Sequence, residues 1–252
     1  MADVAQPSNI SETAPEPQPM APLWHTALLI LILLGLSAGS YLSSRRFVPQ
    51  SSHAGAPPTG AMLLTYGATL AEEWILFFIV LWGERMRSRV TVRERIGARR
   101  EKDALVRDIG IAAGVWGTLA LVGGTLGYFL HPSGKEIVAK LLPRNLPELA
   151  LWTAVAVSAG FCEEYIFRGY LQRQFALLTG SIWAGVVIQA VIFGLGHGYQ
   201  GPALMLTIFC YGLIFGAAAK WRKSLRPTMI AHGWTDLFSG FAGYIGHVMH
   251  LF

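Results

Sequence analysis

The sequence predicts an all-α membrane protein, a polytopic bundle of seven or eight transmembrane helices. Of its 252 residues, 53% are hydrophobic and only 14% are charged, whereas soluble domains carry about 25% charged residues. Several apolar runs approach the roughly 20 residues that a helix needs to cross a bilayer. The runs lack the alternation of a transmembrane strand, so helices rather than a closed barrel would satisfy the backbone in lipid.

Seven apolar runs, separated by polar or glycine- and proline-containing segments, give the positions of the helices. A glycine-rich stretch at 240–246 interrupts the last run, and a break there would add an eighth, short helix. The expected spans are approximately 24–42, 62–82, 109–130, a fourth that begins near Leu149, 182–197, 202–220, and a seventh that begins near Pro227.

Composition divides the chain into three regions. Residues 1–22 contain no Lys or Arg and are rich in proline, which predicts a disordered acidic tail. Residues 23–148 hold the first three helices together with the basic loop 84–107. Residues 149–252 hold the remaining helices and the polar motifs on which the function depends.

The distribution of basic residues predicts the orientation in the membrane. With seven spans, 15 of the 20 Lys and Arg residues lie on the side of the N-terminus, nine of them in the loop 84–107. The positive-inside rule therefore places the N-terminus in the cytoplasm, and we expect a multi-pass protein of a bacterial cell membrane. These loops account for the net charge of +5, and no nucleic-acid-binding motif accompanies it, so membrane lipids rather than nucleic acid are the expected partners.

The segment CEEYIFRGY, residues 162–170, places three charges inside the fourth apolar run. A charged side chain at mid-membrane costs at least about 2.5–3.5 kcal/mol, so Glu163, Glu164 and Arg168 need partners or a wet cavity. Glu164 and Arg168 lie one turn apart on one helix face, in the favourable order for an ion pair. Glu163 points about 100° away from Glu164, so it is expected to face a different group.

His197 is the expected neighbour of Glu163. Both residues are 17 positions from Gly180, which lies in the predicted turn between two helices, so a continuous antiparallel hairpin would bring them to the same depth. His232 and Asp236 are i and i+4 in the last helix and share one face. They follow the start of that helix closely, so they reach the same depth only if the hairpin turn protrudes into the cytoplasm.

Carboxylates and imidazoles in a membrane cavity suit hydrolysis. Glu163 beside His197 can take a proton from water, and His232 supported by Asp236 can stabilise an oxyanion. The chain has no GxSxG and no HExxH motif. Glu163, His197 and His232 can instead ligate zinc, which leaves a metal-dependent variant open. A non-catalytic immunity or scaffold protein and a transporter with a proton relay are further alternatives.

These residues resemble the motifs of the CPBP family, the CAAX prenyl endopeptidases and bacteriocin-processing intramembrane proteases, also called the ABI family. The resemblance covers about residues 149–240, with three motifs in the family's order. Glu163-Glu164-x-x-x-Arg168 is similar to EExxxR, Phe193-x-x-x-His197 to FxxxH, and His232-x-x-x-Asp236 to HxxxN/D.

The resemblance implies an intramembrane glutamate-type endopeptidase, and we expect no cofactor. In the family, the first glutamate and the FxxxH histidine activate water, which implies this role for Glu163 and His197. The second glutamate and the arginine of EExxxR orient the other groups of the site and neutralise each other's charge. The last motif forms the oxyanion site. The implied site residues are thus Glu163, Glu164, Arg168, His197, His232 and Asp236.

A membrane-anchored or lipidated protein or peptide is the implied substrate. The prenyl-protease branch is similar to a pattern with Asn at the final position, from which Asp236 departs. An aspartate has no amide donor, so Asp236 is expected to orient or charge His232. This departure leaves open whether the substrate must be prenylated.

Three further residues near these motifs have open roles. Glu72 and Glu73 repeat the adjacent-acid pattern in the second span without an arginine at i+4, so they either line the same cavity or serve the structure. Cys162 adjoins the glutamates, but a buried cysteine without a nearby cation is more often a small hydrophobic residue than a nucleophile.

Overall fold

The computed structural model describes residues 18–47, 59–87, 89–97, 104–131 and 135–251, and every regular element in these ranges is a helix. The all-α prediction is therefore confirmed for this part of the chain. The elements in chain order are α1 (Leu23–Phe47), α2 (Thr59–Arg85), α3 (Val92–Ile96), α4 (Ala104–Leu130), α5 (Lys135–Leu141), α6 (Leu146–Glu164), the π-helix η1 (Tyr165–Leu171), α7 (Gln172–Thr179), α8 (Ile182–Gly196), the 3₁₀ turn η2 (Gly198–Gln200), α9 (Pro202–Arg222) and α10 (Arg226–Val248).

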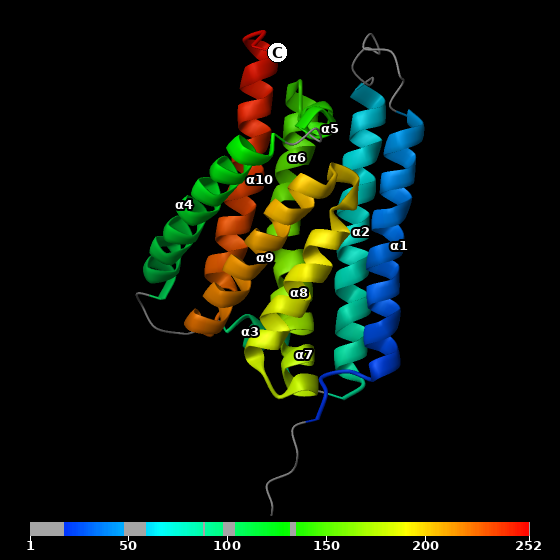
Figure 1. The fold of residues 1–252 in the computed structure, drawn as a ribbon, viewed down its shortest axis with the longest axis vertical. Helices are drawn as coiled ribbons and strands as arrows, with labels where there is room; N and C mark the ends of the chain where they lie inside the picture. The colour runs from blue at the N-terminus through cyan, green and yellow to red at the C-terminus, as the bar shows by residue number, and fades with distance from the viewer. Residues whose placement is uncertain (1–17, 48–58, 88, 98–103, 132–134, 252) are drawn as a thin grey trace, which may run out of the picture.

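The long helices form an up-and-down bundle with α6 near its centre (Figure 1). α6 packs against α2 on one side and α10 on the other, and α8 packs against α7 and α9. α1 and α2 form one flank of the bundle and α4 the other. The α7–α8 and α9–α10 turns lie at the same end as the start of α1, as the predicted alternation requires. The side of the membrane on which this end lies stays a prediction.

The expected count of seven or eight membrane spans is only partly met. Five described helical segments are long and apolar enough to cross a membrane, namely α1, α2, α4, the continuous α6–η1–α7 segment and α9. α8 is apolar but has only 15 residues, because the helix ends before His197. α10 has 23 residues, and its polar side chains and glycines keep it out of this class. Since α10 continues to Val248, the eighth helix expected from a break at 240–246 is not formed.

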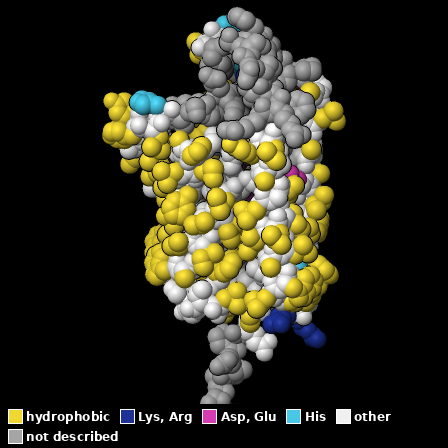
Figure 2. All heavy atoms as spheres, turned by 45° about the vertical axis from the view of Figure 1, so that its right-hand side comes forward, with side chains coloured by type: hydrophobic (Ala, Val, Ile, Leu, Met, Phe, Trp, Pro, Cys, Tyr) yellow, Lys and Arg dark blue, Asp and Glu magenta, His cyan; other side chains and the backbone are white. Residues whose placement is uncertain are grey.

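The outer surface of the bundle is apolar along its middle. Figure 2 shows hydrophobic side chains over the central part of one face, with Lys and Arg gathered at the lower end. Large apolar side chains are exposed on every candidate span, among them Leu31, Ile75, Leu121 and Val157. Exposed apolar surface of this extent is typical of helices that face lipid.

Local sequence signals set the ends of the α6–α8 hairpin. The Asn145 side chain caps α6 by accepting a hydrogen bond from the backbone N–H of Glu148 at 3.0 Å, which satisfies a free donor at the helix start. Gly180 ends α7 in the left-handed conformation, with φ of 69°, which glycine adopts without strain. Ser181 then caps α8 through the backbone N–H of Ala184. The turn expected at Gly180 is therefore present.

The N-terminal tail becomes ordered earlier than its composition predicts. Residues 1–17 lie outside the described residues, so disorder there stays a prediction. Met20 and Ala21 are buried, and Gln174 of α7 accepts a hydrogen bond from the Met20 N–H at 2.7 Å and donates one to the Ala21 carbonyl at 3.0 Å. A buried amide of α7 therefore binds the backbone at residues 20 and 21, just before α1.

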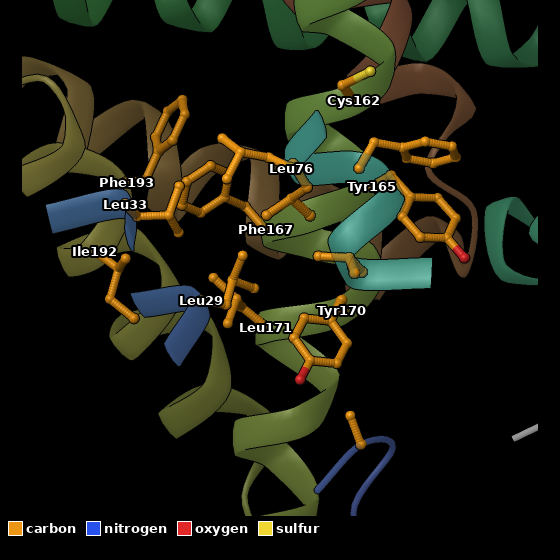
Figure 3. Close-up of a cluster of buried hydrophobic side chains, with 14 of the residues drawn as sticks. Leu29, Leu33, Leu76, Cys162, Tyr165, Phe167, Tyr170, Leu171, Ile192 and Phe193 are labelled. Atoms are coloured by element: carbon orange, nitrogen blue, oxygen red, sulfur yellow. The ribbon is translucent and has the colours of Figure 1, made fainter. Parts of the chain in front are cut away.

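An apolar cluster joins the first two helices to the α6–η1–α7 segment and α8. Figure 3 shows Leu29 and Leu33 of α1 and Leu76 of α2 together with Tyr165 and Phe193. Aromatic pairs extend the contact, since the rings of Phe77 and Tyr165 lie 5.0 Å apart in an edge-to-face arrangement, the geometry that aromatic pairs prefer. This cluster fixes α2 beside α6, where the acidic residues of the two helices meet.

Buried ion pairs hold the lower end of the bundle. Arg95 of α3 lies 3.0 Å from the carboxylate of Glu84, which also accepts a hydrogen bond from the Tyr165 hydroxyl at 2.7 Å. Asp108 of α4 binds Arg222 of α9 at 2.8 Å and Arg226 of α10 at 3.4 Å. At least one basic residue of the loop 84–107 therefore packs into the protein in addition to any role in orientation. Residues 88 and 98–103 of that loop lie outside the described residues.

Replacing Asp108 by Asn is expected to destabilise the protein by about 3–5 kcal/mol, because it leaves the buried Arg222 guanidinium without its counter-charge. Thermal unfolding in detergent micelles measures the change. The control is the triple variant Asp108→Leu/Arg222→Met/Arg226→Gln, which removes Asp108 together with both of its arginine partners and is expected to recover most of the loss. Equal unfolding temperatures for Asp108→Asn and the unmodified protein would contradict a stabilising pair.

Candidate active site

The two adjacent acids at the end of α6, Glu163 and Glu164, point in different directions. Glu164 is fully buried, whereas the Glu163 side chain is 24% exposed and lines a cavity. Directly after them the chain forms the π-helix Tyr165–Leu171, which was not predicted from the sequence. π-helical turns are rare and often occur at functional sites. Together these features mark the end of α6 as the centre of the candidate site.

Glu164 is the hub of a buried ionic cluster. Its Oε1 accepts a hydrogen bond from Arg168 Nη1 at 2.8 Å and lies 3.0 Å from His232 Nδ1. The ion pair expected from the i, i+4 spacing of Glu164 and Arg168 is therefore present. The Arg168 guanidinium also faces the rings of Phe193 at 4.3 Å and Phe215 at 4.9 Å. Such cation–π contacts stabilise a desolvated guanidinium that, among the described residues, has one carboxylate partner.

His232 of α10 presents its second ring nitrogen to the cavity. A carboxylate only accepts hydrogen bonds, so the contact with Glu164 puts a proton on Nδ1 and turns Nε2 outward. Nε2 lies 3.8 Å from Glu163 Oε2 and 3.6 Å from Asp236 Oδ2. These separations exceed a direct hydrogen bond but bring both carboxylates to the same nitrogen. Phe215 fixes the ring by stacking on it, with centroids 5.3 Å apart.

The crossing of α6 and α10 brings these groups together. A Cβ on Gly160 would lie 2.7 Å from the Met229 carbonyl oxygen and 2.9 Å from the Gly233 nitrogen, closer than side chains pack. The absence of a side chain at Gly160 therefore lets the two backbones touch one turn before Glu163 and Glu164 and next to His232. Small residues at such crossings permit close packing of transmembrane helices.

The structure also accounts for the depth at which His232 lies. The histidine is near the start of α10, yet its ring contacts Glu164, which is 16 residues from the Gly180 turn. In Figure 1 the α7–α8 turn extends beyond the α9–α10 turn at the lower end of the bundle. The hairpin therefore extends past the start of α10, which is the relative position that the depth of His232 requires. Its protrusion into the cytoplasm stays a prediction.

His197 lies at the end of α8, where the helix gives way to η2. Its Nδ1 is 2.8 Å from the Phe193 carbonyl oxygen. A carbonyl only accepts, so Nδ1 carries the proton and the neutral ring keeps a lone pair on Nε2. His197 and Glu163 line the same two cavities, but no hydrogen bond or ion pair joins their side chains in the described part of the chain. The hairpin thus brings the two groups to one cavity rather than into direct contact.

Two cavities that share Glu163 and His197 open beside the cluster. The first has a volume of about 340 Å³ and reaches Asp236 and His232 between α2, α6, α9 and α10. The second, of about 540 Å³, reaches Ser37 of α1 and Glu72 of α2. Both volumes fall in the range of small-ligand sites. Neither histidine is turned away to the outer surface, so the acids and imidazoles can act on one bound molecule.

Glu73 and Phe215 belong to the site but were not identified as site residues from the sequence. The adjacent acids at 72 and 73 were the available signal for Glu73, which the structure places in both cavities, whereas Glu72 lines only the second. Phe215 carried no signal that distinguishes it from other apolar residues of α9. Its role follows only from its position between Arg168 and His232.

The zinc alternative finds no preformed ligand set. Within the described residues, no group of three or more His, Cys, Asp and Glu side chains is arranged to hold a metal ion. Glu163, His197 and His232 line one cavity, and the absence of a metal stays a prediction.

Substituting Ala for Gly160 is expected to destabilise the protein by about 1–3 kcal/mol, because the added methyl group overpacks the α6–α10 crossing. Thermal unfolding in micelles measures this effect. Gly114→Ala in α4 is the matched control, since a Cβ there meets no atom within 4 Å and alanine favours helix. A Gly160→Ala protein as stable as Gly114→Ala would refute the proposed close crossing.

Comparison with known proteins identifies the segment that carries this cluster. The family model Rce1-like, described as Type II CAAX prenyl endopeptidase Rce1-like, matches residues 145–238. Searches of the curated proteins and of the solved structures gave no significant match. The matched segment runs from the cap of α6 to the middle of α10 and contains all six predicted site residues, so the resemblance inferred from the three motifs is confirmed.

Proposed function

From the match of residues 145–238 to the Rce1-like prenyl endopeptidases, we propose that the protein is a membrane endopeptidase that hydrolyses a peptide bond of a membrane-associated protein or peptide. The observation that carries the proposal is the convergence of Glu163, His197 and His232 on one cavity between apolar helices. The substrate is membrane-anchored or lipidated, because the cavity lies within the helix bundle.

Glu163 and His197 activate the attacking water. The free Nε2 of His197 and the Glu163 carboxylate are acceptors that face the same space, so a water between them can lose a proton to Glu163 as its oxygen attacks the peptide carbonyl. The attack forms a C–O bond and a tetrahedral oxyanion. When the C–N bond breaks, Glu163 returns the proton to the leaving amine, which leaves a carboxylic acid and an amine as products.

His232 stabilises the oxyanion. With Nδ1 bound to Glu164, its Nε2 is free to donate a hydrogen bond to the tetrahedral intermediate when the ring is protonated. The Asp236 carboxylate, 3.6 Å away, supports the positive charge of the ring. Asp236 therefore acts through His232, in place of the direct amide donor that an asparagine would supply. Glu164 and Arg168 hold the ring in position.

Replacing Glu163 by Gln is expected to lower kcat/KM for a membrane-anchored peptide by at least about 100-fold, because general base catalysis contributes 10²–10⁴-fold. Cleavage by purified protein in proteoliposomes, followed by mass spectrometry, measures it. Cys162→Ala is the matched control: this buried neighbour lies outside the proposed mechanism, so cleavage should persist. Full activity in Glu163→Gln would refute the mechanism, and no cleavage by the unmodified protein would favour a non-catalytic scaffold.

Cleavage is also expected to persist after treatment with a zinc chelator such as 1,10-phenanthroline, because the proposed mechanism activates water with Glu163 and His197 and uses no metal ion. The same proteoliposome assay, run before and after chelation and dialysis, measures the effect. Loss of activity that only added zinc restores would instead assign Glu163, His197 and His232 as metal ligands.

A further inference from the structure

Glu73 is a buried acid without a counter-charge. It lies on the face of α2 that also carries Leu76, Phe77 and Val80, all of them buried, where the helical pattern calls for an apolar residue. Only 6% of Glu73 is exposed. Its carboxyl group is hydrogen-bonded to Ser158, but Oε2 has no hydrogen-bond partner within the described residues. The side chain lines both cavities beside Glu163. An acid desolvated in this way is costly unless a partner binds it.

The surrounding charges leave an excess of negative charge. Around the cavities lie the carboxyl groups of Glu73, Glu163 and Asp236, with Glu72 at the edge of the second. Among the described lining residues of both cavities there is no Lys or Arg. Arg168 lies behind the cavity and is already paired with Glu164. Even if both site histidines are protonated, the carboxylates of the site outnumber its cations.

We infer that Glu73 forms a subsite for a cationic group of the substrate, a Lys or Arg side chain or an amino group close to the scissile bond. The inference rests on the proposed function, and it adds a substrate class to it. A cation fits because it would supply the missing partner of Oε2 and offset the negative field of the site. An acidic side chain or a free carboxyl terminus at the same place would be repelled.

The position of α2 does not depend on Glu73. Trp74 stacks on Phe161 of α6 with ring centroids 5.9 Å apart, and Phe77 contacts both Phe161 and Tyr165. These aromatic contacts hold the helix whether or not residue 73 is charged. The neutral substitution Glu73→Gln keeps the size of the side chain, so it tests charge recognition separately from packing.

The first experiment measures cleavage of membrane-anchored peptides in which a single Lys is moved through the positions around the scissile bond, each paired with a Gln peptide. At one position we expect Lys to raise kcat/KM about tenfold over Gln, as a charged hydrogen bond would. Glu73→Gln should bring this ratio close to one. Glu72→Gln, which removes an exposed carboxylate from the edge of the second cavity, should lower the ratio much less than Glu73→Gln does. Absence of a Lys preference at every position would overturn the inference.

The second experiment measures binding of the same peptides to the His197→Ala protein in nanodiscs by fluorescence anisotropy, and so does not require cleavage. We expect about tenfold tighter binding of the preferred Lys peptide than of its Gln partner. Adding Glu73→Gln should abolish this preference, whereas adding Glu72→Gln should reduce it much less. Preference without cleavage by the unmodified protein would support the subsite but not the peptidase. Cleavage without preference, or an equal loss for Lys and Gln peptides in Glu73→Gln, would refute the subsite alone.

Discussion

The arrangement of the C-terminal half depends on the burial of one carboxylate, that of Glu164. A fully desolvated charge is tolerated only when it is paired and hydrogen-bonded, so Arg168 and His232 must both remain in contact with it. Arg168 is held in turn between aromatic rings of α8 and α9, and His232 belongs to α10. A single acid therefore fixes four helical segments, α6–η1, α8, α9 and α10, relative to one another. These segments in turn position the groups that face the cavity.

Much of this cluster is predictable because transmembrane sequences tolerate few charges. The spacing of Glu164 and Arg168 and the equal distances of Glu163 and His197 from Gly180 followed from regular helices and one turn. The assignment of roles to the three motifs came from the resemblance to a known family. The structure departs from the prediction where the helix is not regular or not apolar: in the π-helix, in the short α8 and in α10. Periodicity carries no information about such local changes of the hydrogen-bond pattern.

Two parts of the chain supply different components of the site. The segment that matches the Rce1-like model, residues 145–238, contains the acids and histidines assigned to chemistry. α1 and α2 lie outside it, yet they provide walls of the second cavity and the Glu73 carboxylate. Lone apolar or acidic residues on these helices gave no pairing signal in the sequence, because their partners come from helices about 90 residues away. The proposed division assigns hydrolysis to the matched segment and selection of the substrate to the N-terminal helices.

The π-helix at Tyr165–Leu171 changes the direction in which the side chains of α7 point. A wider turn accommodates an additional residue, so it rotates α7 relative to the acid pair by about the 100° that one residue occupies in an α-helix. In that rotated setting Gln172 donates to the Gly216 carbonyl oxygen of α9, and Gln174 binds the backbone before α1. Insertions and deletions that surface loops absorb would here turn both amides away from their partners, so the length of this segment is as constrained as the identity of its charged residues.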